Sequence, residues 1–199
     1  ALSFEVLILM RTLCECNLYG ILDLGYVSPG NVVPMTRALL EGGVDILQLR
    51  AKHSAPHEVE AFARGMLPLT RDAGIPLVIN DHPEVAGIVG SEGVHVGQVD
   101  LSVAETRRIV GPSCFVGKST HSEAQARAAM EEAPDYIGFG PLCATGTKPD
   151  YTPVGLGAIA QVEKLSAVPV FCIGGVNRDR LPQILAAGAR RVVIVPAFL

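Results

Sequence analysis

Residues 77–96 read LVINDHPEVAGIVGSEGVHV, and this stretch contains the pattern that decides the fold. An apolar run at 77–79 is followed by a helix-like segment at 83–89 and by a second apolar run at 93–96. Short apolar runs of this kind are typical of strands that are buried on both faces of a parallel sheet. The stretch therefore predicts a strand, a helix and a strand, which together are the repeating unit of a parallel α/β fold.

The same alternation extends in both directions along the chain. The predicted strands are 18–22, 46–49, 77–79, 93–96, 115–117, 136–139, 170–173 and 192–195. The predicted helices are 33–41, 57–73, 83–89, 102–110, 122–131, 156–165 and 181–187. Ser102, with Glu105 three residues later, predicts a capping box, and Ser122 predicts a second N-cap. Eight strands with seven helices predict a TIM (β/α)8 barrel whose last helix is missing.

The length and composition favour one globular domain. The chain has 199 residues, of which 49% are hydrophobic and 18% are charged, and its mean hydropathy is +0.36. These values fit a fold with buried strands. We expect a single barrel domain over residues 1–199, with residues 1–17 as an N-terminal extension in which 4–10 form an amphipathic helix that caps the barrel.

Charge and cysteine content argue against several classes of partner. The formal net charge is −4 and no block of lysine or arginine is present, so we expect no nucleic-acid partner. No stretch approaches the roughly 20 apolar residues of a membrane span, so we expect no membrane partner either. Five cysteines, an odd number without paired zinc-type spacing, predict a reducing, cytoplasmic location.

Polar residues follow several predicted strands, where the loops of a barrel form its active face. After the second strand, alternation places Gln48, Arg50 and Lys52 on one side of an extended segment. An amide and two cations suit a diphosphate. The alternative is a solvated strand end with an incidental ion pair.

Two carboxylates follow the third and fourth strands. Asp81 comes directly after Asn80, and Asp100 follows the fourth strand. Carboxylate oxygens are the ligands that Mg²⁺ prefers, with waters and phosphates completing its coordination. The pair predicts a magnesium site, with helix N-caps as the alternative interpretation.

A hydroxyl and an imidazole, Ser119 and His121, follow the fifth strand, without the sequence of a hydrolase elbow around Ser119. A lone histidine next to a helix start, such as His121, is more often a capping or packing residue than a functional one. The loop at 138–150 lacks the order and spacing of a P-loop, so we expect a mobile lid that offers threonine hydroxyls and one lysine, or else an ordinary surface loop. Gly174 and Gly175 after the seventh strand, with the end of the eighth, predict a second site for a phosphate.

Taken together, these motifs resemble those of the thiamine-phosphate synthase family. The similar strings are 48–52, 79–81, 93–98 with Asp100, Gly117 with 119–121, 135–138 with Gly140-Pro141, 145–148 and 173–176. The resemblance runs from about Leu18 to the C-terminus. It implies a transferase that condenses 4-amino-2-methyl-5-(diphosphomethyl)pyrimidine with a thiazole phosphate, or its carboxylate, and releases pyrophosphate through a pyrimidine methylene cation.

The resemblance also implies the roles of individual residues. The pyrimidine diphosphate would be held by Gln48, Arg50, Lys52, Asn80, Ser119 and Lys148, of which Arg50, Lys52, Ser119 and Lys148 would be catalytic. The thiazole phosphate would be held by Thr145, Gly146, Thr147, Gly175, Val195 and Pro196. The cofactor would be Mg²⁺, with Asp81 and Asp100 as its ligands. We further expect small-molecule substrates and a homodimer.

Three residues depart from the family pattern, and two other functions compete. Pro196 replaces a small hydroxyl residue, Ala51 an acidic residue and Lys118 an apolar one. One alternative is a thiazole tautomerase of the same superfamily with His121 as its proton carrier. The other is a non-catalytic barrel that binds thiamine precursors.

Overall fold

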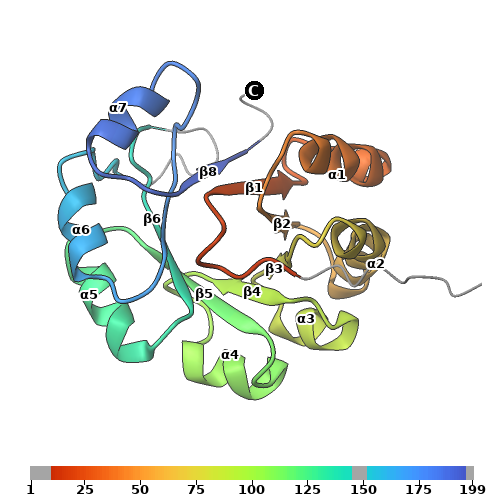
Figure 1. The fold of residues 1–199 in the computed structure, drawn as a ribbon. Helices are drawn as coiled ribbons and strands as arrows, with labels where there is room; N and C mark the ends of the chain where they lie inside the picture. Colours follow the sequence, from red (N-terminus) through yellow and green to blue (C-terminus); the bar gives the residue numbers. More distant parts are fainter. Residues whose placement is uncertain (1–9, 145–151, 196–199) are drawn as a thin grey trace, which may run out of the picture.

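The computed structural model describes residues 10–144 and 152–195. Eight parallel strands follow one another around a closed barrel, and β8 pairs with β1 (Figure 1). The strands are β1 (Leu18–Asp23), β2 (Ile46–Arg50), β3 (Leu77–Asn80), β4 (Gly93–Val96), β5 (Phe115–Thr120), β6 (Tyr136–Phe139), β7 (Val170–Cys172) and β8 (Val192–Ile194). The predicted (β/α)8 barrel is confirmed.

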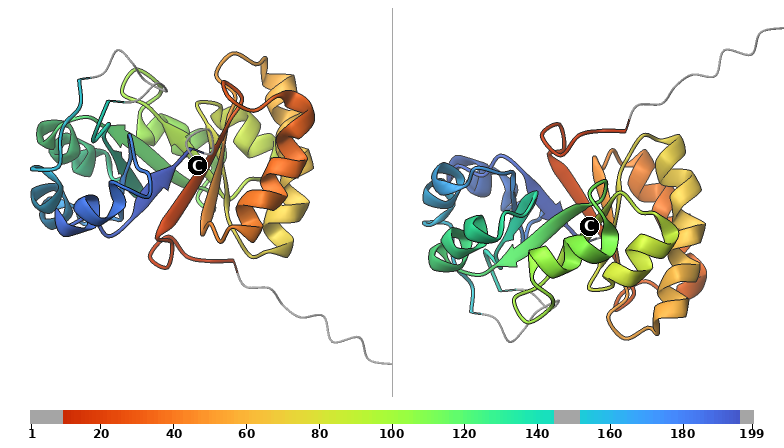
Figure 2. Two further views of the ribbon diagram at one scale, coloured as in Figure 1. Left: turned by 90° about the horizontal axis from the view of Figure 1, so that it is seen from above. Right: turned by 90° about the horizontal axis from the view of Figure 1, so that it is seen from below.

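Within residues 10–144 and 152–195, seven α-helices and one short 3-10 helix alternate with these strands. They are η1 (Pro29–Asn31), α1 (Val32–Glu41), α2 (Pro56–Asp72), α3 (Pro83–Val89), α4 (Val103–Val110), α5 (Glu123–Glu132), α6 (Ile159–Leu165) and α7 (Leu181–Ala186). They surround the barrel, with α1 and α2 on the side opposite α5, α6 and α7 (Figure 2). Val195 is the single described residue after β8, so the predicted absence of a last helix stays a prediction.

Helix boundaries follow local chemistry. The Ser102 hydroxyl accepts a hydrogen bond from the Glu105 amide at 3.3 Å, and the Glu105 carboxylate accepts one from the Ser102 amide at 2.9 Å. This confirms the capping box that the sequence predicts at α4. The prediction for α6 was wrong by three residues, because glycines at 155 and 157 disfavour helix before Ile159.

Strand β5 is longer than predicted, which matters for the site. Pairing with β6 continues to Thr120, because Ser119 pairs with Gly138 and Thr120 with Phe139. Side chains alternate along a strand, so Lys118 and Ser119 point to opposite faces. Ser119 is thereby held by the barrel itself rather than by a loop.

Aromatic rings fill part of the barrel interior. Tyr19, Tyr136 and Phe171 are at most 2% exposed, and their rings meet at centroid distances of 5.3 to 5.9 Å. Gly117 makes room for this packing, since a Cβ there would lie 2.1 Å from the Tyr136 ring. The rings close the interior below the active face, so that the open space lies toward the carboxyl ends of the strands.

The described part of the predicted N-terminal extension lies at the opposite end of the barrel. The Arg11 amide donates to the Gly74 carbonyl at 3.0 Å, and the Asn17 amide donates to Asp45 at 2.9 Å. Both partners precede strands. The predicted helix at 4–10 lies outside the described residues except for Met10. Among the helices that are described, none combines the length and the apolar character needed to cross a bilayer.

Candidate active site at the carboxyl ends of the strands

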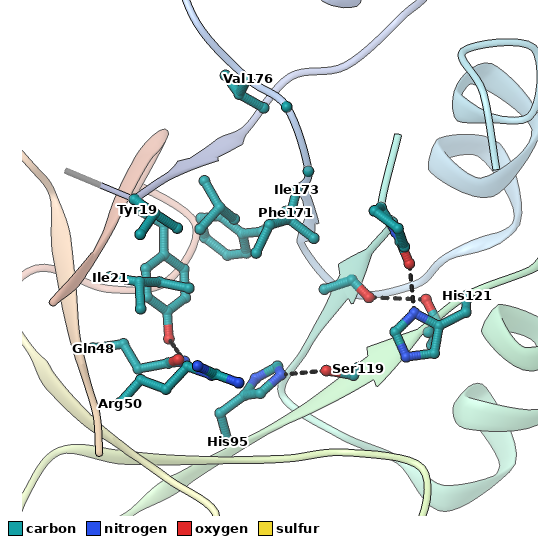
Figure 3. A pocket seen from close by; sticks show the side chains of 18 of the residues that line it. Tyr19, Ile21, Gln48, Arg50, His95, Ser119, His121, Phe171, Ile173 and Val176 are labelled. Atoms are coloured by element: carbon teal, nitrogen blue, oxygen red, sulfur yellow. Dashed lines mark hydrogen bonds between the residues drawn. The ribbon is translucent and has the colours of Figure 1, made fainter. Parts of the chain in front are cut away.

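Two neighbouring pockets open where the strands end. The inner pocket has a volume of about 290 Å³ and lies inside the barrel mouth (Figure 3). The outer pocket has a volume of about 530 Å³ and lies above β1 to β5. Both pockets are lined by Arg50, Asn80, Ser119 and His121. A single ligand can therefore place one part in each pocket.

The predicted diphosphate residues divide between these pockets. Gln48, which is 3% exposed, lines the inner pocket, and Lys52 lines the outer one. Arg50, Asn80 and Ser119 belong to both. Alternation along β2 thus turns Gln48 and Arg50 toward connected space, and Lys52, two residues beyond the end of β2, lines the same space. Lys148 lies outside the described residues.

Arg50 is held by a buried carboxylate that sequence reasoning missed. Arg50 Nη1 lies 2.6 Å from Asp23 Oδ2, and Asp23 is 2% exposed. Asp23 Oδ1 also accepts a hydrogen bond from the Gly25 amide at 2.8 Å. Asp23 pairs with Arg50 in the β1–β2 register, a signal that appears only once the strands are aligned. The ion pair fixes the guanidinium at the boundary between the two pockets.

Asp81 and Asp100 face each other in the outer pocket. Burial, the charge of Asp100 and a hydrogen bond with the Asp100 carboxyl raise the pKa of Asp81, and Lys52 and Arg50 oppose this rise. Asp81 adopts φ 62°, a left-handed conformation that is uncommon outside glycine and that concentrates at functional sites. Asp100 Oδ2 accepts a hydrogen bond from the Gly97 amide at 2.6 Å.

The helix boundaries bear on one of the two interpretations of these carboxylates, the N-caps. The N-cap residue of α3 is His82, and the N-cap residue of α4 is Ser102. Neither aspartate caps a helix, so that alternative is wrong. Two carboxylates that repel each other beside cations instead fit a divalent ion between them. No group of three potential metal ligands occurs in the described residues, so waters or phosphate oxygens would complete the coordination.

His121 and Lys118 have structural contacts. His121 Nδ1 hydrogen-bonds the Gly140 carbonyl, and its amide donates to Gln125 at 2.7 Å. Lys118 is 4% exposed, and its Nζ lies 3.4 Å from Glu132 at the end of α5. Lys118 therefore ties β5 to a helix on the outside of the barrel, away from both pockets.

We expect Lys118→Met to retain activity within about twofold of wild type, because the lysine faces away from the site. Thermal unfolding should change little, since methionine fills similar space and the Glu132 side chain, which is 35% exposed, stays solvated without the lysine. Steady-state rates and a melting curve measure both effects. A loss of activity beyond about tenfold with an unchanged melting temperature would place Lys118 in the chemistry.

The loops after β6 and β7 are joined to each other. The Leu142 amide donates to the Ile173 carbonyl at 2.8 Å, and the Cys143 amide donates to the Gly174 carbonyl at 3.1 Å. Gly175 and Val195, both predicted for the thiazole phosphate, line the inner pocket. Arg180 also lines it and donates to the Gly175 carbonyl at 3.1 Å, a cation that the sequence analysis missed.

The remaining residues predicted for this second phosphate cannot be placed. Thr145, Gly146, Thr147 and Pro196 lie outside the described residues. Residues 144 and 195 are the nearest described positions, and both line the inner pocket.

The inner pocket contains a hydrogen-bonded chain of side chains that sequence reasoning also missed. Gln48 Nε2 donates to the Tyr19 hydroxyl at 2.7 Å, and the Tyr19 and Tyr136 hydroxyls lie 3.0 Å apart. The Tyr136 hydroxyl lies 2.9 Å from His95 Nδ1, and His95 Nε2 lies 2.9 Å from Ser119 Oγ. Figure 3 marks its two ends, Gln48 with Tyr19 and His95 with Ser119. Alternation along β1, β4 and β6 could have indicated that these side chains point inward.

Comparisons with known proteins agree with the geometry. A family model described as thiamine monophosphate synthase matches residues 18–198. A thiamine-phosphate synthase of Thermus thermophilus is 42% identical over 165 residues, which are 82% of this chain and 79% of that protein. One of Shouchella clausii is 38% identical over 180 residues, which are 90% of this chain and 86% of that protein.

A solved structure is also similar. The thiamine phosphate pyrophosphorylase of Pyrococcus furiosus superposes with a TM-score of 0.82 at 27% identity, covering 90% of this chain and 85% of that one. The family model, the similar sequences and the similar structure show that this chain belongs to the thiamine monophosphate synthase family.

Proposed function

We propose that this chain joins 4-amino-2-methyl-5-(diphosphomethyl)pyrimidine to a thiazole phosphate, or its carboxylate, to form thiamine phosphate and pyrophosphate. One observation carries the proposal: Arg50 and Lys52 meet the facing carboxylates of Asp81 and Asp100 in a pocket that adjoins an aromatic-lined cavity. Family membership supports the same activity.

The two pockets suit the two parts of the pyrimidine substrate. The inner pocket, with the Tyr19, Tyr136 and Phe171 rings in its wall and Gln48 beside them, would receive the pyrimidine ring. The outer pocket would receive the diphosphate, with Arg50 and Lys52 as its cations. Asn80 and Ser119 lie between the two and would hydrogen-bond the bridging oxygens. Lys148 would add a third cation.

Asp81 and Asp100 would hold Mg²⁺. A bound divalent cation would neutralise charge on the diphosphate and make it a better leaving group. The raised pKa of Asp81 supports this role, because burial and the charge of Asp100 both disfavour its carboxylate, and a cation between the carboxylates would offset both effects.

The chemistry requires no strong base from the protein. The amino group of the pyrimidine donates electrons as the carbon–oxygen bond to diphosphate breaks, and the electron pair leaves with the diphosphate. The thiazole nitrogen then donates its lone pair to the resulting methylene cation and forms the new carbon–nitrogen bond. Arg50, Lys52, Ser119 and Lys148 would stabilise the leaving group, and the enclosed inner pocket would limit access of water.

The second substrate would enter beside the loops after β6, β7 and β8. Gly175 and Val195 would present backbone N–H groups to the thiazole phosphate. Thr145, Gly146 and Thr147 would bind the same phosphate, and Pro196 would lie beside it without an N–H to donate. The two rings would then lie close together over the inner pocket, which lowers the entropic cost of the reaction.

The direct test is to incubate the protein with the pyrimidine diphosphate, the thiazole phosphate and Mg²⁺, and to quantify thiamine phosphate as its fluorescent thiochrome derivative. We expect product that disappears with EDTA and returns when excess Mg²⁺ is added. Folded protein that forms no product would overturn the proposal, and isomerisation of a thiazole carboxylate phosphate would favour the tautomerase. A homodimer and a cytoplasmic location stay predictions; the free cysteines are typical of a reducing compartment.

A further inference from the structure

The hydrogen-bonded chain from Gln48 to Ser119 has a definite direction. A tyrosine hydroxyl carries one hydrogen, and Tyr19 and Tyr136 are buried, so a hydroxyl that accepts from one neighbour pairs its own hydrogen only by donating to the other. Gln48 Nε2 donates to Tyr19, so Tyr19 donates to Tyr136. Tyr136 then donates to Nδ1 of His95, and His95 carries its hydrogen on Nε2 and donates to Ser119.

This direction gives the ends of the chain opposite characters. The NH2 group of Gln48 is engaged by Tyr19, so the other terminal atom of this pocket-lining amide is the carbonyl oxygen Oε1, an acceptor. At the far end, the Ser119 hydroxyl accepts from His95 and keeps its own hydrogen to donate. The pocket thus has an acceptor at one side and a donor at the other.

Packing alone does not account for these polar groups. The Tyr19 and Tyr136 rings meet Phe171 edge to face at centroid distances of 5.3 and 5.4 Å, contacts that phenylalanine would make equally well. Burying hydroxyl groups in a core costs free energy that hydrogen bonds among them mainly offset. Burial also raises the pKa of both tyrosines, so each keeps the hydrogen that the chain requires.

We propose that Tyr19, Tyr136 and His95 are positioning residues that hold the Gln48 amide with its acceptor toward the substrate, so that the site selects an aminopyrimidine diphosphate over an oxopyrimidine diphosphate. This inference rests on the proposed function. The amino group of the substrate donates to Gln48 Oε1. An oxo group at the same position is itself an acceptor, so binding it requires the amide to turn and every hydrogen bond of the chain to reverse.

The test is the ratio of dissociation constants for the two pyrimidine diphosphates, measured by calorimetry with Mg²⁺ and without the thiazole. Wild-type protein should bind the amino compound about 100-fold more tightly than the oxo compound. Tyr19→Phe should lower this ratio about tenfold or more, because the amide loses the acceptor that orients it. Measuring binding rather than turnover keeps the different reactivities of the two compounds out of the comparison.

Tyr136→Phe is the sharper variant, because Tyr136 makes no hydrogen bond to Gln48. Without Tyr136 as acceptor, the Tyr19 hydroxyl is free to turn its hydrogen toward Gln48, and the amide can then turn its NH2 to the pocket. We expect this variant also to lower the ratio about tenfold. Phe115→Leu is the control: Phe115 packs against Tyr136 at a centroid distance of 6.0 Å but has no polar atom, so the ratio should stay at the wild-type value.

The outcomes separate this inference from the proposed function. Wild-type protein that binds neither diphosphate would overturn both. Wild-type protein that prefers the amino compound, with both tyrosine variants keeping that preference, would overturn only the positioning role. An equal fall in Phe115→Leu would also overturn it, because packing alone would then explain the effect.

Discussion

Replacing Asp81 with asparagine is expected to make the protein more stable and nearly inactive. Asparagine removes the repulsion from Asp100, and it adopts the left-handed conformation of residue 81, φ 62°, at least as readily as aspartate. We expect unfolding to cost about 1 kcal/mol more, which raises the melting temperature by about 2–4 °C. The same change removes a proposed Mg²⁺ ligand, so formation of thiamine phosphate should fall about 1,000-fold.

The pH dependence of stability gives an independent check on Asp81. Its pKa is raised in the folded protein, so the folded state holds this proton to higher pH than the unfolded state does. The free energy of unfolding of the wild-type protein should therefore fall as the pH rises from the unfolded-state pKa of Asp81 to its raised folded-state pKa. Asp81→Asn has no titrating group at this position, so its stability should lack this decrease. The stability difference between the two proteins should be greatest near neutral pH and should disappear in acid.

A matched control is Glu60→Gln on the exposed face of α2. Glu60 pairs with Arg64 at 2.7 Å in a surface ion pair, so its replacement should cost at most about 0.5 kcal/mol and leave the rate unchanged. Urea unfolding and the thiochrome assay measure both quantities. An Asp81→Asn protein with full Mg²⁺-dependent activity would remove Asp81 from the metal site.

Replacing Arg50 with methionine should damage folding and catalysis together. The change leaves the Asp23 carboxylate, 2% exposed, without its cation, and such an uncompensated buried charge costs about 3–5 kcal/mol. The variant should also lose at least about 1,000-fold in rate, because the cation between the two pockets is gone. Urea unfolding measures the first loss, and thiochrome fluorescence under conditions where the variant is folded measures the second.

The double variant Asp23→Asn with Arg50→Met separates these two effects. Removing the buried charge should restore most of the lost stability, whereas the rate should stay at the level of the single variant. If the double variant recovered activity along with stability, Arg50 would act only through folding. Unchanged stability in the single variant would mean that water reaches Asp23 when Arg50 is absent.

The sequence by itself determined the barrel and most of its active face. Periodicity is a local property of the sequence, so apolar runs such as 77–79 and 93–96 locate the buried strands directly. The alternation of these strands with helices then predicts parallel strands that follow one another in chain order. Alternation in an extended segment also predicted Gln48, Arg50 and Lys52 on one side, and these residues line the two connected pockets. The motif resemblance supplied the family, and the comparisons agree with it.

Only the tertiary structure decided which side chains meet across the barrel. Asp23 and Arg50 are 27 residues apart, and Tyr19 and Tyr136 are 117 apart, so no local pattern predicts that either pair will touch. Their contacts depend on strand register, on barrel closure and on space such as that left by Gly117. Alternation along each strand therefore limits which residues can point inward, whereas closure of the barrel determines which of them are partners, because register and curvature are properties of the whole sheet.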